Sequence, residues 1–231
     1  MDLSLLQQLN EERAARRAAI LVTRLDDGSQ RLVRRSGNHS ADPLKEEFAK
    51  RFRSGKSGTV ATDTGDVFLT VSVPSPRLVV IGAVHITQAL VPMAEIAGLD
   101  GTVIDPRTAF ATEERFPGCT LRPDWPEEVL KHTPLDAYTA VAAVTHDPKI
   151  DDFPLIEALK TECFYIGALG SRKTHGKRLE RFTAEGLDPA LFDRIDAPIG
   201  LNIGAASPQE IAVAVLGSII SALRKAPEPG L

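Results

Sequence analysis

The sequence predicts an α/β protein in which a doubly wound, Rossmann-like parallel sheet follows a small α+β N-terminal domain. Residues 78–81 form a continuous apolar run, which is typical of a strand buried on both faces of a parallel sheet. Further short apolar runs alternate with helical segments after it, as in βαβ units. Pro74-Ser75-Pro76 punctuates the chain before this pattern begins. We therefore expect a small α+β domain over residues 1–76 and a Rossmann-like domain over residues 77–231.

The N-terminal domain reads as a mixture of helices and strands. The charge pattern predicts helices over residues 3–17 and 43–53. Apolar and alternating residues predict strands over residues 19–25, 30–34 and 67–73. Asp27-Gly28 is a turn signal that joins the first two strands.

The C-terminal domain alternates strands with helices. We expect strands over residues 78–81, 102–104, 119–121, 140–144 and 164–166. We expect helices over residues 86–97 and 154–160, and a third from Ser171. The closing helix begins at a capping box, Ser207-Pro208-Gln209-Glu210, with proline at the first helical position. Its apolar face comprises Ile211, Val215, Ile219 and Leu223.

Composition excludes several classes of protein. The 231 residues are 43% hydrophobic and 25% charged with a formal charge of -4, which is typical of a globular protein and gives no electrostatic footprint for nucleic acid. Two cysteines, Cys119 and Cys163, cannot form a disulfide framework or a four-ligand zinc site alone, and we expect no metal site. Residues 1–19 lack a signal-peptide pattern, and no apolar run is long enough to span a membrane. We therefore expect a cytoplasmic protein that binds no membrane.

The turn after residues 78–81 lies where a dinucleotide fingerprint belongs. Gly82 is the first glycine of that fingerprint, but Val84 and Thr87 replace the second and third. Asp105 follows about 20 residues later, at the end of the next strand, where a ribose-binding acid lies. The frame of a nucleotide site is present without its glycines. Retained nucleotide binding and an inherited turn without a ligand are equally compatible with it.

A second candidate follows the fourth strand of the C-terminal domain. His146 and Asp147 adjoin each other at the edge where such sheets bind ligands, and His85 could point into the same crevice. In one interpretation these residues act as an acid–base pair or as metal ligands. An Asp-Pro turn with a surface histidine is the alternative, and residue types alone favour it. We assign neither a catalytic residue nor a metal ligand.

The most informative stretch leaves the fifth strand. Gly170 and Ser171 open a helix whose first turns carry many cations: Arg172, Lys173, His175, Lys177 and Arg178. Cations there oppose the helix dipole, whereas free amides with nearby cations form an anion site. A solvated basic face is the alternative. Gly200 and Gly204, around Asn202, either allow a ligand to approach or mark a tight crossing of the backbone.

In combination, five motifs resemble the XdhC/CoxF family of maturation factors for xanthine and carbon monoxide dehydrogenases. They lie at residues 78–85, 103–107, 145–148, 165–175 and 198–204. The resemblance implies a non-catalytic protein that binds molybdenum cofactor and assists its sulfuration and insertion into a molybdenum hydroxylase apoenzyme, with a cysteine desulfurase as second partner. A homodimer is left open.

The resemblance implies a set of cofactor-binding residues along one edge of the sheet: Gly82, His85, Asp105, Arg107, His146, Asp147, Gly170, Ser171, Arg172, His175 and Asn202. The chain departs from the family at Val84, where glycine is usual, and at Asn202, where aspartate is frequent. Residues 36–40 replace a Ser-Gly-Gly-Cys motif without its cysteine, and a second Cys-Gly-Gly motif is missing, so the N-terminal domain is a reduced one. Two alternatives stay open: an oxidoreductase that binds NAD(P), and an interaction protein that has lost its ligand.

Overall fold

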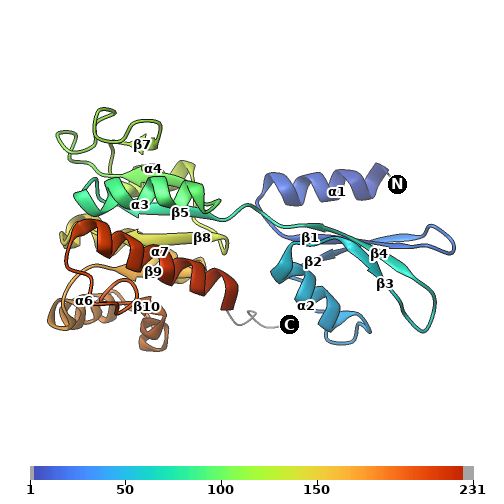
Figure 1. Cartoon of the computed structure of the whole chain (residues 1–231). Helices are drawn as coiled ribbons and strands as arrows, with labels where there is room; N and C mark the ends of the chain where they lie inside the picture. The colour runs from blue at the N-terminus through green and yellow to red at the C-terminus, as the bar shows by residue number, and fades with distance from the viewer. Residues whose placement is uncertain (1–2, 226–231) are drawn as a thin grey trace. The chain divides into compact units, whose positions relative to one another are not determined.

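The computed structural model describes residues 3–225, which form two compact units (Figure 1). Unit 1 ends at Pro74 and unit 2 begins at Ser75. Each unit is described by itself.

Unit 1 is a four-stranded antiparallel sheet with a helix on each face (Figure 1). Its strands are β1 (Ala19–Arg24), β2 (Gln30–Arg34), β3 (Gly58–Val60) and β4 (Val67–Ser72), in the order β2-β1-β4-β3. Its helices are α1 (Leu3–Ala14) and α2 (Lys45–Ser54). Ala19, Ile20 and Leu21 of the central strand are all buried, because both faces of the sheet are covered. The α+β character predicted for this region is confirmed.

Unit 2 is a six-stranded parallel sheet. Its strands are β5 (Arg77–Ile81), β6 (Asp100–Ile104), β7 (Thr120–Arg122), β8 (Thr139–Ala143), β9 (Tyr165–Ala168) and β10 (Ile195–Asp196). They lie in the order β7-β6-β5-β8-β9-β10. Numbered from the first strand of the unit, this is the order 3-2-1-4-5-6 of a Rossmann fold. The predicted fold class is confirmed, and the order reverses between β5 and β8.

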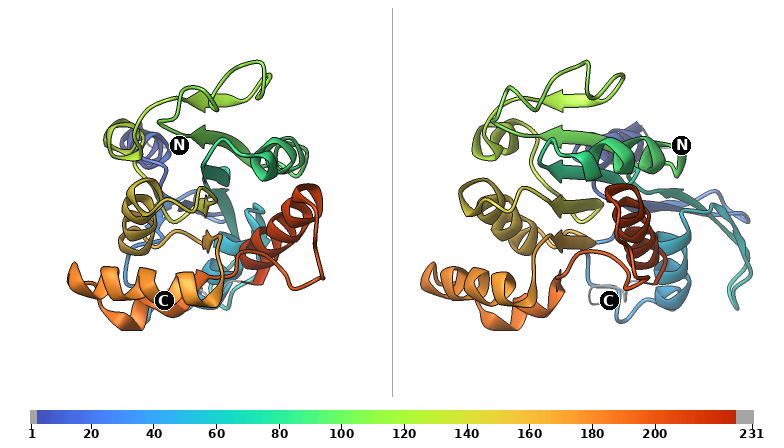
Figure 2. Two further views of the ribbon diagram at one scale, coloured as in Figure 1. Left: turned by 90° about the vertical axis from the view of Figure 1, so that its left-hand side faces the viewer. Right: turned by 60° about the vertical axis from the view of Figure 1, so that its left-hand side comes forward.

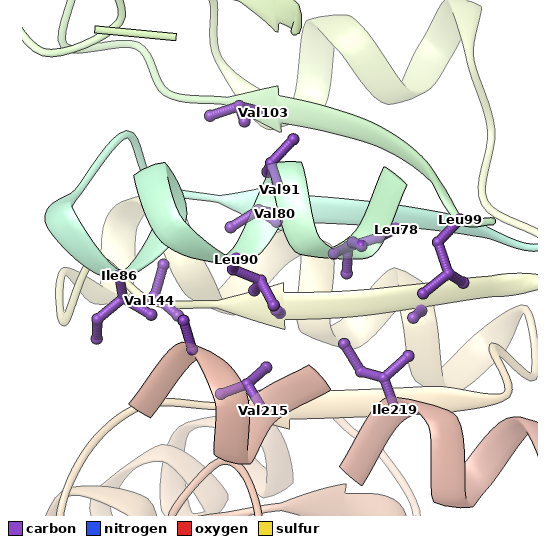
Figure 3. Packing of buried hydrophobic residues seen from close by; sticks show 14 of the residues in the cluster. Leu78, Val80, Ile86, Leu90, Val91, Leu99, Val103, Val144, Val215 and Ile219 are labelled. Carbon is purple, nitrogen blue, oxygen red and sulfur yellow. The ribbon is translucent and has the colours of Figure 1, made fainter. Parts of the chain in front are cut away.

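Helices cover both faces of this sheet (Figure 2). One face carries α3 (His85–Ile96) and α7 (Pro208–Lys225). The other face carries α4 (Pro126–His132), α5 (Pro148–Lys160) and α6 (Arg172–Ala184). A 3-10 turn at Pro189–Arg194 follows α6. Figure 3 shows Leu90 of α3 and Val215 and Ile219 of α7 over the strands. The apolar runs of β5 and β8 are buried throughout because two such layers enclose them.

The sequence missed the short elements and misplaced one helix start. β3, α4 and β10 are each seven residues or fewer, which leaves little periodicity to detect. Helix α5 begins at Pro148 instead of Pro154, because Asp147 caps it by accepting a hydrogen bond from the Lys149 amide. The capping box of α7 is confirmed: Ser207 Oγ accepts from the Glu210 amide, and Glu210 Oε2 accepts from the Ser207 amide at 3.0 Å.

Two glycines of the 198–204 loop predict a matched test of packing. Both lie in the left-handed region, Gly200 at φ 90° and Gly204 at φ 75°. A Cβ on Gly200 would lie 2.9 Å from the Val215 amide nitrogen of α7, whereas a Cβ on Gly204 would meet nothing within 4 Å. Gly204→Ala should cost about 1–2 kcal/mol for the backbone conformation alone. Gly200→Ala should cost about 1–3 kcal/mol more, because the helix backbone cannot yield.

Denaturant unfolding of the two variants measures the difference. Equal losses of unfolding free energy in the two variants would show that the α7 backbone leaves room for a Cβ at position 200.

Candidate functional site

The carboxyl edge of the unit 2 sheet holds the predicted site residues, and β5 and β8 meet there at the reversal of strand order. Rossmann folds bind ligands in the crevice at this point. Gly82 follows β5 with φ 121°, and a Cβ there would lie 2.8 Å from Thr145 Cγ2 after β8. The glycine is therefore required by the backbone and by the neighbouring loop, without reference to a ligand.

Asp105, the predicted ribose acid, is fully buried, and its oxygens are already occupied. Its Oδ2 accepts from the Ala83 amide at 2.7 Å and from Arg107 Nη2 at 2.7 Å. Its Oδ1 accepts from the amide and from Nε of Arg107, both at 2.9 Å. Burial alone would raise the pKa of Asp105, but these four donors outweigh it and hold the pKa below its ordinary value. A ribose hydroxyl would have to displace one of them, so the structure argues against this role.

Hydrogen bonds hold both the amide and the carbonyl of Ala83 in this turn. The Ala83 amide donates to Asp105, and its carbonyl accepts from Arg115 Nη1 at 3.1 Å. Val84 occupies the N-cap position of α3 in an extended conformation, its side chain makes no capping hydrogen bond, and it packs partly against the apolar core. A pyrophosphate in a dinucleotide site needs the amides of this turn. One of them is engaged within the protein, and a β-branched residue takes the position of the second glycine.

The turn after β8 is built around a buried acid that sequence reasoning missed. Asp151 of α5 is fully buried and accepts from Thr145 Oγ1 at 2.7 Å and from the His146 amide at 3.1 Å. Burial is the main cause that raises the pKa of Asp151 to about 6, against the lowering effect of the Thr145 hydrogen bond and the Arg178 charge. Asp147 is the N-cap of α5, so the Asp-Pro turn anticipated as the alternative is present.

His146 and the start of α6 are brought together around a pocket. Its volume is about 280 Å³, and its lining residues are His146, Pro148, Lys173, Thr174, Lys177, Arg178 and Arg181. None of these is a carboxylate. His146 has φ 67°, in the left-handed region that few non-glycine residues adopt, and its side chain is exposed at the pocket.

The remaining predicted residues of this region shape α6 or lie outside the pocket. Ser171 caps α6 by accepting from the Thr174 amide at 3.2 Å, and Gly170 has φ 131°. Arg172 is exposed and His175 half-buried, and neither lines the pocket. Burial is the first cause that lowers the pKa of His175, and the Arg178 charge is the second.

Two other predicted residues also lie apart from the pocket. His85 is exposed at the first position of α3, after β5. Asn202 is exposed in the loop between β10 and α7. Neither lines the pocket.

The pocket cations were visible in the sequence but were not separated from their neighbours. Lys173, Lys177 and Arg181 recur at every fourth residue, which places them on one face of α6. Arg178 adjoins that face and is only 3% exposed. Helical spacing was the available signal, because it separates Lys173, Lys177 and Arg181 from the neighbouring Arg172.

The pKa of each cysteine thiol is raised above its ordinary value. Burial is the main cause that raises the pKa of Cys163 to about 11. Burial also raises the pKa of the Cys119 thiol, helped by the charge of Glu95. Within residues 3–225, no three metal-binding side chains cluster, and no helix is at once long and apolar enough to cross a membrane.

The domain that contains this edge matches a known protein family. The XdhC Rossmann domain family matches residues 78–219, more than half of the chain. A crystal structure described as a xanthine dehydrogenase from Bacillus halodurans superposes with a TM-score of 0.62 at 24% identity, over 98% of this chain and 67% of that one. At that identity the superposition shows a shared fold.

Three curated proteins are also similar in sequence. The uncharacterized protein YqeB of Escherichia coli is 33% identical over 78% of this chain and 34% of its own length. A Bacillus subtilis protein, named as a probable subunit of xanthine dehydrogenase, is 31% identical over 70% of this chain and 47% of its own. The molybdenum cofactor insertion chaperone PaoD of E. coli is 28% identical over 64% and 40%. The chain thus spans between a third and a half of the length of these relatives.

The engaged state of Asp105 predicts a structural role. Asp105→Asn should lower the unfolding free energy by about 2–4 kcal/mol, because it removes a buried charge from four donors and leaves some unpaired. Asp100→Asn is the matched control at the exposed start of the same strand, and it should change stability by less than about 0.5 kcal/mol. An Asp105→Asn protein of unchanged stability would contradict the structural role.

The buried acid Asp151 predicts a pH dependence of stability. Its pKa lies about two units above the value of 3.8 for an exposed aspartate, so the folded chain binds this proton more tightly than the unfolded chain. The resulting stabilisation is complete below pH 3.8 and is lost as pH rises through about 6, a loss of about 3 kcal/mol. Asp151→Asn removes this contribution.

Urea unfolding of both proteins from pH 4 to pH 7 tests it. The stability of the native chain relative to Asp151→Asn should fall across this interval. Parallel curves would show that Asp151 is ionised throughout.

Proposed function

The chain belongs to the XdhC family, and from that premise we propose that it is an accessory factor that binds molybdenum cofactor and assists its insertion into a xanthine-dehydrogenase-type molybdenum enzyme. Two relatives support the proposal through their names, one as a molybdenum cofactor insertion chaperone and the other as part of a xanthine dehydrogenase. In this role the cofactor is cargo that the protein takes up and releases.

The observation that carries the proposal is the cationic pocket at the carboxyl edge. Molybdenum cofactor is a pterin that carries a phosphate, so its carrier needs positive charge and hydrogen-bond donors. Lys173, Lys177 and Arg178 supply both at the start of α6, and no carboxylate lines the pocket with them. The residues present therefore fit an anionic cargo.

The same edge disfavours the alternative of an NAD(P)-dependent oxidoreductase. Asp105 is saturated, and the Ala83 amide is directed at it. We therefore propose a protein that binds its ligand without catalysing a reaction on it.

Calorimetry with NAD and with NADP should show no binding.

Sulfuration of the cofactor is assigned to a partner. Burial raises the pKa of both cysteine thiols, and a thiol in that state is a poor nucleophile. The loop at Ser36–Ser40 contains no thiol; its Asn38 side chain accepts hydrogen bonds from Ser40. We propose that a separate cysteine desulfurase supplies the sulfur and that this chain presents the cofactor to it and to the apoenzyme.

Cofactor retention tests the proposal. The full chain is incubated anaerobically with free molybdenum cofactor under reducing conditions and passed through a desalting column. Pterin fluorescence and molybdenum should co-elute with the protein, and the loaded protein should restore activity to a molybdenum hydroxylase apoenzyme faster than free cofactor does. If no pterin co-elutes, the proposed function is wrong.

A further inference from the structure

The most unusual polar group in the described part of unit 2 is the Arg178 guanidinium. The residue is 3% exposed, and its Nε has no hydrogen-bond partner within residues 3–225. Its other nitrogens make only long contacts, Nη2 to the Leu169 carbonyl at 3.3 Å and Nη1 to His175 Nδ1 at 3.5 Å. A buried, charged donor without a partner is unfavourable, so this group is poised to donate to an incoming acceptor oxygen.

Nearby carboxylates do not fill this role. Asp152 Oδ1 lies 3.8 Å from Arg178 Nε, beyond hydrogen-bond distance, and both its oxygens are held by Arg181 at 2.5 and 2.9 Å. Asp151 is engaged by Thr145 and by the His146 amide. Burial is the main cause that lowers the pKa of Arg178 despite these two acids.

The wall around Arg178 adds charge of the same sign. Lys173 and Lys177 are exposed, line the pocket and form no ion pair within the described residues, whereas Arg181 is neutralised by Asp152. Thr174 adds a hydroxyl beside them. Two lysines without an ion pair, a buried guanidinium with an unused donor and a hydroxyl suit a multiply charged, tetrahedral anion better than a single carboxylate.

We propose that this pocket is a phosphate subsite, in which Arg178 donates to one phosphate oxygen from within while Lys173 and Lys177 neutralise the group from the rim. The assignment rests on the proposed function for the larger ligand: the phosphate end of the cofactor is the part held here. The pocket volume of about 280 Å³ is far larger than the roughly 10–15 Å³ that one water molecule needs, so it has room for a phosphate group.

The subsite explains two features of the sequence. The cations at the start of α6 oppose its helix dipole, and a bound dianion beside them would reverse that disadvantage. His146 holds a strained backbone conformation at the pocket, immediately after Thr145, whose methyl fills the space beside Gly82. Strain of this kind is frequent where residues are positioned for a ligand.

Isothermal titration of the full chain with inorganic phosphate and with pyrophosphate, at about 0.15 M ionic strength, tests the subsite, because exposed charges more than about 8 Å apart are then largely screened. Lys173→Ala/Lys177→Ala should weaken binding by about 10-fold or more, and Arg178→Lys by about 10-fold, since it retains the charge without the guanidinium geometry. Lys149→Ala is the matched control: an exposed cation in the first turn of α5, outside the lining, whose loss should change affinity by less than about twofold at this screening. Thermal unfolding of each variant confirms that it is folded.

The outcomes separate the subsite from the proposed function. No binding of either anion to the native chain, or equal losses in the double variant and in Lys149→Ala, would overturn the subsite even if pterin still co-elutes. Anion binding that is lost in the double variant supports the subsite even if no pterin is retained.

Discussion

The buried carboxylate of Asp105 is the constraint on which the carboxyl edge of unit 2 depends. An ionised acid removed from water persists only where donors replace its hydration, and here one backbone turn and one arginine supply all of them. The bond to Ala83 joins the end of β5 to the end of β6, and so fixes the entry of the chain into α3. The guanidinium carbons of Arg107 and Arg115 lie 5.0 and 5.7 Å from the centroid of the Phe110 ring, and these contacts extend the arrangement into the following loop. The edge is thus shaped from within the protein and needs no ligand to hold it.

A second set of charged side chains lies on the other side of the point where the strand order reverses, and its hydrogen bonds are less complete. Asp151, Asp152 and Arg178 are buried at the contact of α5 with α6, and the partly exposed Arg181 completes the set, in which two acids face two bases. Their hydrogen bonds do not pair off evenly: both acids are satisfied, and one guanidinium nitrogen is not. The Asp105 set is complete, whereas this set has an unused donor, and the contrast separates structural charge from charge available to a ligand.

Much of this fold follows from local sequence, and the site follows from it only in part. The buried runs of β5 and β8 and the capping box of α7 carry strong short-range signals, so the layers and the parallel sheet were predictable. The strands β3 and β10 are too short to carry any. At the site, sequence separation placed Asp105 correctly but could not show that Arg107 saturates it. The composition of the α6 turn indicated an anion site, yet only the packing of α5 against α6 shows that Arg178 is buried while Arg172 remains exposed.

The closed turn at Ala83 also bears on how such a chain can change over evolutionary time. A glycine at position 84 would restore the familiar fingerprint on paper, but the amide before it would still point at Asp105, and Thr87 Oγ1 would still donate to the Gly82 carbonyl at 2.6 Å. A coenzyme site here would require replacement of Asp105 after β6 and of Thr87 in α3 as well as of Val84, and loss of the Asp105 hydrogen bonds would destabilise the protein. The hydrogen bonds that stabilise this domain are thus the same ones that keep its first turn closed to a coenzyme.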